Sequence, residues 1–517
     1  MSKTRLLALA SVIVALCALA VTLHAGHPVQ AHLVHSDALY LPVLFQDLLR
    51  HGGSLGDWFL TPAPYFFPDF PLYLLAWLGG AGVFEQTTLF ALLQTVLAAS
   101  ALFLLARRAL PGAHWPATAA LTTLFVWLGL HVDDPFVRLF SSAHHYGAFV
   151  AALLLLALWL GLDGGQESRR GRRAGAAVVL LAFLTTLSDA LFLVQAVMPL
   201  LAAALLCRQG AAPATAPRRA ALLLFAPALL AMVSYRFVVA HPTRFPARLG
   251  FKNLSANLDE FGKILVALLG PRPLLAAVLL LALLAGLACT VACLRRKALF
   301  DLPRPLQLLL VFATLSCAAT VVVMLLSTSV QPAPRYLITA LSSLLVSGVF
   351  ALAWLAGPRL RFALPGLALV FAGLLAADAW RVRDQRATDT YFYPEQVACI
   401  DRALAASGAR HGIAQYWDAK RVQGLSRRDL TIAQYTGTLT PMEWITSQRF
   451  YGAGYDFAII ADQEAAEFRL PRAPLTALNG EPLRTVACGD RSVLLFGPGR
   501  LRIPPALQES ASHQAAR

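Results

Sequence analysis

The segment LLALASVIVALCALAVTL, residues 6–23, is an unbroken apolar run near the start of the chain. As a helix it would rise about 27 Å, close to the ~30 Å hydrocarbon core of a bilayer. Only helices and closed barrels satisfy their backbone hydrogen bonds in lipid, and a continuous run indicates a helix. We interpret the segment as an uncleaved first membrane span. The alternative is a signal peptide, because Lys3 and Arg5 precede the run and Ala25 and Gly26 follow it.

The composition extends this interpretation to most of the chain. Of 517 residues, 58% are hydrophobic and 14% are charged, whereas soluble domains carry about 25% charged residues. The net charge of +15 does not indicate nucleic-acid binding, because the Arg residues lie in short clusters between apolar runs. The sequence predicts an α-helical polytopic membrane protein with about eleven spans. These are 6–24, 86–106, 115–132, 145–162, 174–188, 190–207, 219–240, 272–294, 305–328, 335–356 and 362–380.

The basic clusters between the runs predict the topology. If all of them face the cytoplasm, the N-terminus is cytoplasmic and the C-terminal region lies outside. Residues 70–84 are nearly long enough to span, but a span there would reverse every later cluster. We therefore expect a re-entrant or interfacial helix within a first external loop, residues 25–85. The clusters are Lys3/Arg5, Arg107/Arg108, Arg169/Arg170/Arg172/Arg173, Arg208/Arg218/Arg219, Arg295/Arg296/Lys297 and Arg359/Arg361.

Hydrophobicity falls near residue 381, which divides the chain into two domains. We expect a membrane domain over residues 1–383, a small soluble α/β domain over 384–502 and a disordered tail over 503–517. Cys399 and Cys488 are the only cysteines of the soluble domain. An oxidising compartment would permit a disulfide between them; the alternative is two free buried thiols.

His35-Ser36-Asp37 opens the first external loop and is the most informative polar stretch. Leu41, Leu44, Phe45 and Leu48 follow at helical spacing, which predicts a short helix on the membrane surface. Asp37 near its start has two interpretations. It is either a helix N-cap or a carboxylate placed at the membrane rim for acid–base chemistry.

Four further motifs occur in a characteristic order along the chain. They are PDFPLYLLAW at 68–77, LLARR at 104–108, LSDAL at 187–191 and PRYLI at 334–338. With Asp37 after the first span, this layout resembles the GT-C superfamily of membrane glycosyltransferases, the group that includes protein O-mannosyltransferases and lipid A aminoarabinose transferases. The resemblance covers about residues 1–380. The chain departs from the family pattern at Asp189, where the family often has Lys. It also departs at the place of a second acidic residue: either His144 and His145 replace that residue, or Asp133 and Asp134 lie too far upstream to serve.

The resemblance implies an inverting transferase that moves a sugar from a polyprenyl-phosphate donor to a glycan, lipid or protein acceptor. The reaction would occur at the outer face of a bacterial inner membrane. Asp37 would be the base, and no cofactor is required, although His144 and His145 leave a divalent metal as an alternative. The donor-phosphate contacts would come from Arg335, Tyr336 and Arg236. The residues around the sugar and acceptor would be His35, Tyr65, Asp69, His144, His145 and Asp189.

Two other functions fit a polytopic chain with an outer domain. One is a transporter or flippase for lipid-linked sugars, which would place charged residues deep in the spans. The other is a non-catalytic anchor that presents residues 384–502. The candidate residues instead gather at the predicted outer face, which favours an enzyme that works there.

Overall fold

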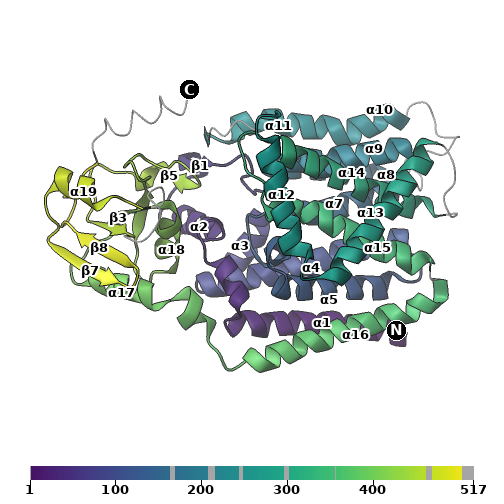
Figure 1. Cartoon of the computed structure of the whole chain (residues 1–517), viewed down its shortest axis with the longest axis horizontal. Coiled ribbons are helices and arrows are strands. Elements are labelled where there is room, and N and C mark those ends of the chain that lie inside the picture. Colours follow the sequence, from purple (N-terminus) through teal and green to yellow (C-terminus); the bar gives the residue numbers. More distant parts are fainter. Residues whose placement is uncertain are drawn as a thin grey trace.

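The molecule consists of a body of long helices and a smaller α/β domain at one end of that body (Figure 1). The N-terminus lies at the opposite end of the body from the α/β domain. This computed structural model describes residues 2–162, 169–207, 216–243, 248–295, 302–355, 357–461 and 469–503. The predicted tail therefore lies, except for Ile503, outside the described residues.

Helices occur at each of the eleven predicted spans. Within the described residues, eight helices are long and apolar enough to cross a membrane by length and composition, so the count of eleven stays a prediction. Tyr146–Leu162 and Leu193–Leu206 are apolar but shorter. The main helices are α1 (Lys3–His24), α4 (Val83–Ala109), α5 (His114–His131), α7 (Tyr146–Leu162), α8 (Arg169–Ser188), α9 (Met198–Leu206), α11 (Ala226–Val238), α13 (Pro273–Leu294), α14 (Arg304–Leu326), α15 (Ile338–Leu355) and α16 (Gly357–Val382).

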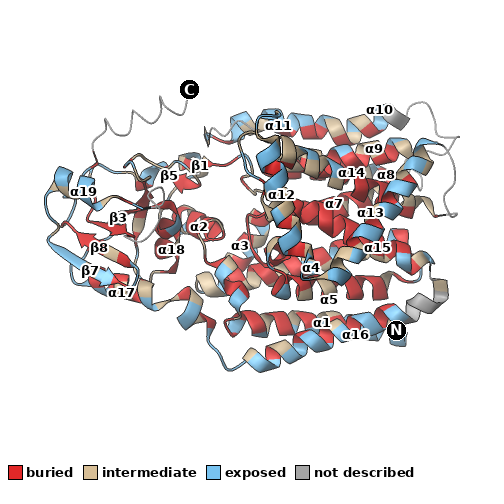
Figure 2. Cartoon of the chain, in the orientation of Figure 1, coloured by how far each residue is buried: buried red, intermediate tan, exposed pale blue. Residues whose placement is uncertain are grey.

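The outward faces of the body remain apolar. Leu274 on α13 is 84% exposed and Leu222 is 66% exposed, and exposed and intermediate residues mark the outer helices in Figure 2. Such leucines need no protein cover in a bilayer, because lipid tails are as apolar as they are. Burial concentrates instead on α7 and α15, in the middle of the body (Figure 2).

Three helices lie between or beside the main ones: α2 (Tyr40–Arg50), α3 (Asp69–Gly79) and α12 (Leu254–Leu269). The 11 residues of α3 rise about 17 Å, roughly half of the hydrocarbon core. This agrees with a segment that does not cross the membrane. The predicted range of 70–84 was too long, because α3 ends before Gly80 and α4 begins at Val83.

The outer domain has a five-stranded sheet in the order β4-β3-β6-β8-β7. Strands β4, β3 and β6 are parallel, and β6, β8 and β7 are antiparallel. A disulfide joins Cys399 on α17 to Cys488 on β7. The elements are α17 (Glu395–Ala405), β3 (His411–Ala414), α18 (Tyr416–Leu425), β4 (Thr431–Gln434), β6 (Phe457–Ile460), α19 (Arg472–Asn479), β7 (Arg484–Cys488) and β8 (Arg491–Leu495). The short sequence between the parallel strands β3 and β4 is α18, so these three elements form a βαβ unit.

A second, three-stranded sheet joins the outer domain to two loops of the body, which the sequence did not predict. Its order is β2 (His241–Pro242), β1 (Trp58–Leu60) and β5 (Thr446–Ser447). Helix α2 contacts α18, and its apolar side chains share a core with Trp58 and with residues of the outer domain. The predicted surface helix is therefore covered by the outer domain, which fixes the turn that precedes it.

Candidate active site

Asp37 lies in the turn before α2, between the helical body and the outer domain. Helix α2 begins at Tyr40 with Leu39 as its N-cap residue, so the interpretation of Asp37 as the helix cap is wrong. The Oδ1 atom of Asp37 accepts a hydrogen bond from the hydroxyl of Tyr416 on α18. Its Oδ2 atom lies 3.9 Å from Nη1 of Arg335, and the Asp37 side chain is 20% exposed.

Helix α18 of the outer domain holds this turn in place. The hydroxyl of Ser36 donates to the backbone oxygens of Tyr416 at 2.7 Å and Trp417 at 2.9 Å. Burial, together with the charge of Asp37, raises the pKa of Tyr416 well above its ordinary value. Tyr416 therefore keeps its proton and acts as a donor to the carboxylate.

Lys420 lies one helical turn after Tyr416 and packs against its ring. Its Nζ atom is 4.2 Å from the centre of the Tyr416 ring and donates to Oε1 of Gln434 at 2.8 Å and to the backbone oxygen of Ile445 at 3.2 Å. Burial lowers the pKa of Lys420 to about 7. Neither Tyr416 nor Lys420 was predicted, and no motif around them in the sequence marks them as part of this site.

Arg335 and Tyr336 come from the short helix Pro334–Leu337 that leads into α15. The guanidinium lies 5.3 Å from the centre of the Tyr336 ring, and the Arg335 side chain is 37% exposed. Gln195 fixes this segment by donating to the backbone oxygen of Tyr336 at 2.8 Å. A guanidinium has five N–H donors and matches phosphate oxygens in pairs. Arg335 is therefore suited to bind an anion beside Asp37.

A second cluster of ionisable side chains is buried next to Tyr336. His145 Nδ1 lies 2.6 Å from Oδ2 of Asp189, and His145 Nε2 lies 3.3 Å from the hydroxyl of Tyr65. The Asp69 carboxylate accepts from the amide of Ala143 at 2.8 Å. Burial raises the pKa of Asp69 to about 7, and the nearby charge of Asp189 acts in the same direction. The His145 ring is 5.5 Å from the ring of Tyr336, which connects the two clusters.

The backbone of this region is strained at three non-glycine residues. Tyr65, Ala143 and His145 have φ angles of 59°, 60° and 66°, in the left-handed region that L side chains rarely adopt. Such residues persist only where the surrounding structure holds them, and they gather at functional sites. Here the hydrogen bonds of Tyr65, Ala143 and His145 to their buried partners hold them.

His144 and His145 are neighbours in sequence but point into different clusters. The His144 ring lies 5.3 Å from the ring of His35, edge to face, whereas His145 pairs with Asp189. The structure thus places His35 and His144 beside Asp37. It places Tyr65, Asp69, His145 and Asp189 in the buried cluster. Arg236 is exposed on α11, and no contact among the described residues joins it to Asp37 or Arg335.

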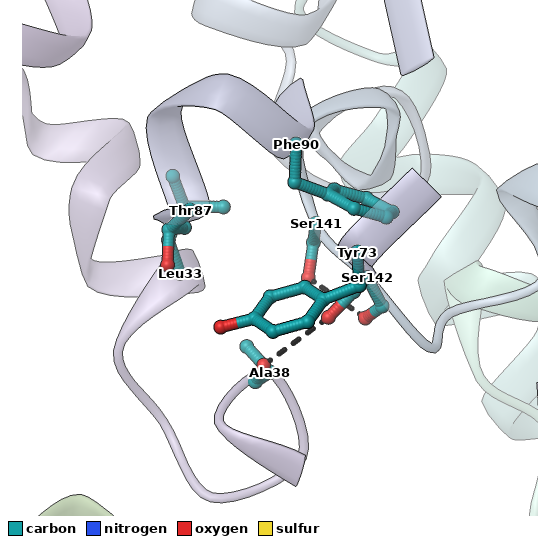
Figure 3. Close-up of a pocket in the computed structure, with 7 residues that line it drawn as sticks. All are labelled: Leu33, Ala38, Tyr73, Thr87, Phe90, Ser141 and Ser142. Carbon is teal, nitrogen blue, oxygen red and sulfur yellow. Dashed lines mark hydrogen bonds between the residues drawn. The ribbon is translucent and has the colours of Figure 1, made fainter. Parts of the chain in front are cut away.

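A small cavity lies behind the Asp37 turn and shows how the loops are held together (Figure 3). The hydroxyl of Ser142 donates to the backbone oxygen of Ala38 at 3.3 Å across it. The Asp37 turn and the loop that carries His144 are therefore connected directly. The lining residues are Leu33, Ala38, Tyr73, Thr87, Phe90, Ser141 and Ser142.

Solved structures share this architecture at low sequence identity. The crystal structure of ArnT from Cupriavidus metallidurans bound to undecaprenyl phosphate matches with a TM-score of 0.58, 15% identity, and coverage of 96% of this chain and 99% of that one. The apo structure of the same protein matches with a TM-score of 0.52, 13% identity, and coverage of 96% and 98%. The chain has a GT-C-like fold.

This result confirms the predicted fold class of a helical membrane body with a small C-terminal α/β domain. It extends the predicted resemblance from about residues 1–380 to nearly the whole chain, including the outer domain. No protein-family model matches the sequence, and no curated protein matches it. With its apolar helices, the GT-C-like fold is that of a multi-pass membrane protein.

Proposed function

We propose that this protein is a membrane glycosyltransferase that takes its sugar from a polyprenyl-phosphate donor. The observation that carries the proposal is the pair of Asp37 and Arg335, 3.9 Å apart and partly exposed at the end of the helical body next to the outer domain. The GT-C-like fold supports it, because a solved structure with this fold holds undecaprenyl phosphate.

The proposed reaction is one displacement at the anomeric carbon of the sugar. The acceptor hydroxyl attacks that carbon, and Asp37 takes the hydroxyl proton. The bond between the anomeric carbon and the phosphate oxygen breaks, and the polyprenyl phosphate leaves with the bonding electrons. A single displacement inverts the anomeric configuration, so one base is sufficient. The acceptor is a glycan, lipid or protein with a free hydroxyl.

Arg335 would stabilise the negative charge that develops on the leaving phosphate. A guanidinium serves this purpose well because it is permanently charged and binds phosphate oxygens with two parallel hydrogen bonds. Tyr336 lies under the guanidinium and orients it. We place the reaction at the outer face of a bacterial inner membrane, with the N-terminus in the cytoplasm. The alternation of basic clusters supports this orientation.

Binding of undecaprenyl phosphate to the purified full chain tests the donor part of the proposal. We expect Arg335→Ala to weaken binding about 10- to 100-fold, since a hydrogen bond to a charged group contributes about 1.5–3 kcal/mol. The control is Arg381→Ala, because Arg381 also faces a carboxylate, Asp378 at 3.2 Å, but is 76% exposed on α16. Native mass spectrometry measures both variants. Equal binding by Arg335→Ala and the wild type would remove Arg335 from the donor site.

A turnover assay tests the sugar-transfer part of the proposal. The wild type should release undecaprenyl phosphate from an undecaprenyl-phosphate sugar only when an acceptor is present. If the protein binds the lipid but releases no undecaprenyl phosphate with any of a panel of donors and acceptors, the proposed enzymatic activity is wrong. That result would favour a carrier of lipid-linked sugars.

A further inference from the structure

An open groove runs along three helices in the half of the body that carries the N-terminus. It is lined by residues of α1, α4 and α5 and has a volume of about 380 Å³, within the ~300–1,000 Å³ of small-molecule sites. Leu9, Val96 and Leu104 on its walls are 41%, 46% and 44% exposed, so the groove opens to the outside of the body. We propose that it binds an anionic glycerophospholipid of the membrane, with an acyl chain in the groove and the phosphate at two arginines beyond one end.

The length and chemistry of the groove match one acyl chain. Its lining runs from Ala8 to Leu16 on α1 and from Val96 to Leu104 on α4. Eight residues of helix rise about 12 Å, and one leaflet holds about half of the ~30 Å hydrocarbon core. The two hydroxyls in the lining, on Ser100 and Thr118, already donate to backbone oxygens of their own helices at 2.8 Å. They therefore need no polar partner from a ligand.

Two arginines lie beyond the end of the groove that is nearest the N-terminus. Arg5 precedes the lining residue Leu9 by four positions on α1. Arg107 follows the lining residue Leu104 by three positions on α4. Each arginine is thus a neighbour of a lining residue on the same helix face. Both arginine charges act on His114 at the start of α5, which places the ends of all three helices together here.

Neither arginine has an acidic partner in the part of the chain that the structure describes. No ion pair or side-chain hydrogen bond joins Arg5 or Arg107 to a described residue, and no acidic group acts on His114. The end of the groove is therefore positive and complementary to an anion. Basic pockets between membrane helices bind anionic lipid head groups, and a guanidinium binds phosphate oxygens in pairs.

Aromatic rings connect the arginines to the groove. The His114 ring lies 5.4 Å from the ring of Phe103, and the Phe103 ring lies 4.8 Å from that of Trp115. Phe103 and Trp115 both line the groove. Tryptophan is enriched where the hydrocarbon core meets the head groups, which is also the depth of the ester groups of a phospholipid. A phosphate at the arginines therefore leads directly to a chain in the groove.

Two other occupants fit less well. Two copies of the chain in one membrane have the same orientation, so the arginines of both would meet and repel each other. A polyprenyl-phosphate donor would carry its phosphate to Asp37 and Arg335, next to the outer domain. The N-terminus lies at the opposite end of the body (Figure 1). The groove is thus a separate site, and its occupant does not depend on the proposed function.

Native mass spectrometry of the purified, delipidated full chain in detergent tests the proposal. The protein is titrated with phosphatidylglycerol and with phosphatidylcholine that have the same acyl chains. The wild type should prefer phosphatidylglycerol, because only this lipid has a net negative charge. Arg5→Gln and Arg107→Gln should each reduce the preference about fivefold, the factor expected for one basic residue beside an anionic lipid. The double variant should reduce it about 25-fold.

The matched control is Arg108→Gln, next to Arg107 in sequence. The Nη2 atom of Arg108 lies against α7, 3.1 Å from the place of a Cβ atom on Gly161, so this variant should keep the preference. Ser100→Phe tests the groove itself, because Ser100 is an exposed lining residue and the larger ring fills the space. This variant should lose binding of both lipids.

Four results would overturn the proposal. The wild type could show no preference, or Arg107→Gln and Arg108→Gln could lose it equally. Ser100→Phe could bind phosphatidylglycerol as the wild type does. A wild-type dimer that Ser100→Phe dissociates would assign the groove to a second copy. Undecaprenyl phosphate that displaces phosphatidylglycerol from the wild type, and binds more weakly to Arg107→Gln, would assign it to the polyprenyl lipid.

These outcomes are separate from those of the proposed function, since no sugar donor or acceptor is present. A chain that prefers phosphatidylglycerol but transfers no sugar would keep the groove site and lose the transferase. A chain that transfers sugar but shows no lipid preference would lose the groove site and keep the transferase.

Discussion

Two pairs of an aspartate and a basic side chain lie next to one another in this structure and differ in how exposed they are. Asp37 and Arg335 are 3.9 Å apart, with 20% and 37% of their side chains exposed. Asp189 and His145 are 2.6 Å apart, with 4% and 7% exposed. The first pair is loose and open, so a substrate can reach both members. The second is tight and covered, and its members contact each other.

Under the proposed function, the open pair takes part in the reaction and the closed pair supports it, a distinction that residue types alone do not make. The tight pair packs against Tyr336 through the His145 ring, directly next to Arg335. The closed pair therefore helps to hold Tyr336, and through it Arg335, in position. If this is correct, changes in the open pair reduce activity and leave stability unaltered, whereas changes in the closed pair reduce stability.

The largest effect is expected for Asp37→Asn. A general base contributes about 10²–10⁴-fold to rate, so kcat for sugar transfer should fall by that factor. The thermal unfolding midpoint should not change, because the amide can still accept from Tyr416. The control is Asp57→Asn in the same external loop, where Asp57 bonds Ser54 and Gln448. Full activity of Asp37→Asn would contradict the assignment of Asp37 as the base.

The next effect is expected for Asp189→Ala and is on stability. Removal of Asp189 leaves His145 buried without this hydrogen-bond partner and costs about 1–3 kcal/mol, measured as unfolding of the full chain in detergent. Asp429→Ala removes the partner of His51 in a pair of similar length, 2.8 Å, with 59% of Asp429 exposed. That control should cost about 0–1 kcal/mol. Similar losses in both variants would show that burial does not distinguish the two pairs.

Much of the body could be predicted from the sequence because each membrane helix has a local sequence signal. A continuous apolar run between basic clusters needs no information from distant residues, and each predicted run contains a helix. The helix after Asp37 followed from the spacing of Leu41, Leu44 and Phe45 alone.

Only those residues of the candidate site that belong to the helical body could be predicted from the sequence. Asp37 and Arg335 lie in motifs with a recognisable order, so the sequence alone proposes both as site residues. Tyr416 is 379 positions from Asp37, and nothing in its own segment indicates that the outer domain folds back onto the first loop. The contact depends on the small sheet of β1, β2 and β5, whose strands have two or three residues each. Strands this short carry too little pattern for recognition.

Tyr416→Phe tests whether the outer domain supports the open pair. The change removes one hydrogen bond to a charged group, worth about 1.5–3 kcal/mol at most and less where the carboxylate is partly hydrated. We expect kcat to fall about tenfold while KM for the donor stays the same, because Arg335 is untouched. Tyr393→Phe is the control, since Tyr393 donates to Asp401 at 3.2 Å elsewhere in the outer domain. Equal activity of Tyr416→Phe and the control would mean that the outer domain covers Asp37 but does not contribute to its activity through Tyr416.

The last effect is expected for Asp69→Asn, and it appears as a small change in stability with each unit of pH. Burial raises the pKa of Asp69 to about 7 in the folded chain, whereas an unfolded aspartate ionises near pH 3.9. Between about pH 4 and 7 the folded chain keeps a proton that the unfolded chain has lost. The free energy of unfolding of the wild type therefore decreases as pH rises through this interval, by at most about 1.4 kcal/mol per pH unit from this group.

Asp69→Asn lacks the titrating proton but can still accept from the amide of Ala143. The free energy of unfolding of the variant minus that of the wild type should therefore increase from pH 5 to pH 7. Above about pH 7 this difference should stay constant. Other titrating groups cancel in the difference between the two curves. Parallel curves would mean that Asp69 is ionised throughout, and the closed cluster would then hold two carboxylates against one histidine. Such a cluster would need a further cation, and the difference between the closed pair and the open one would disappear.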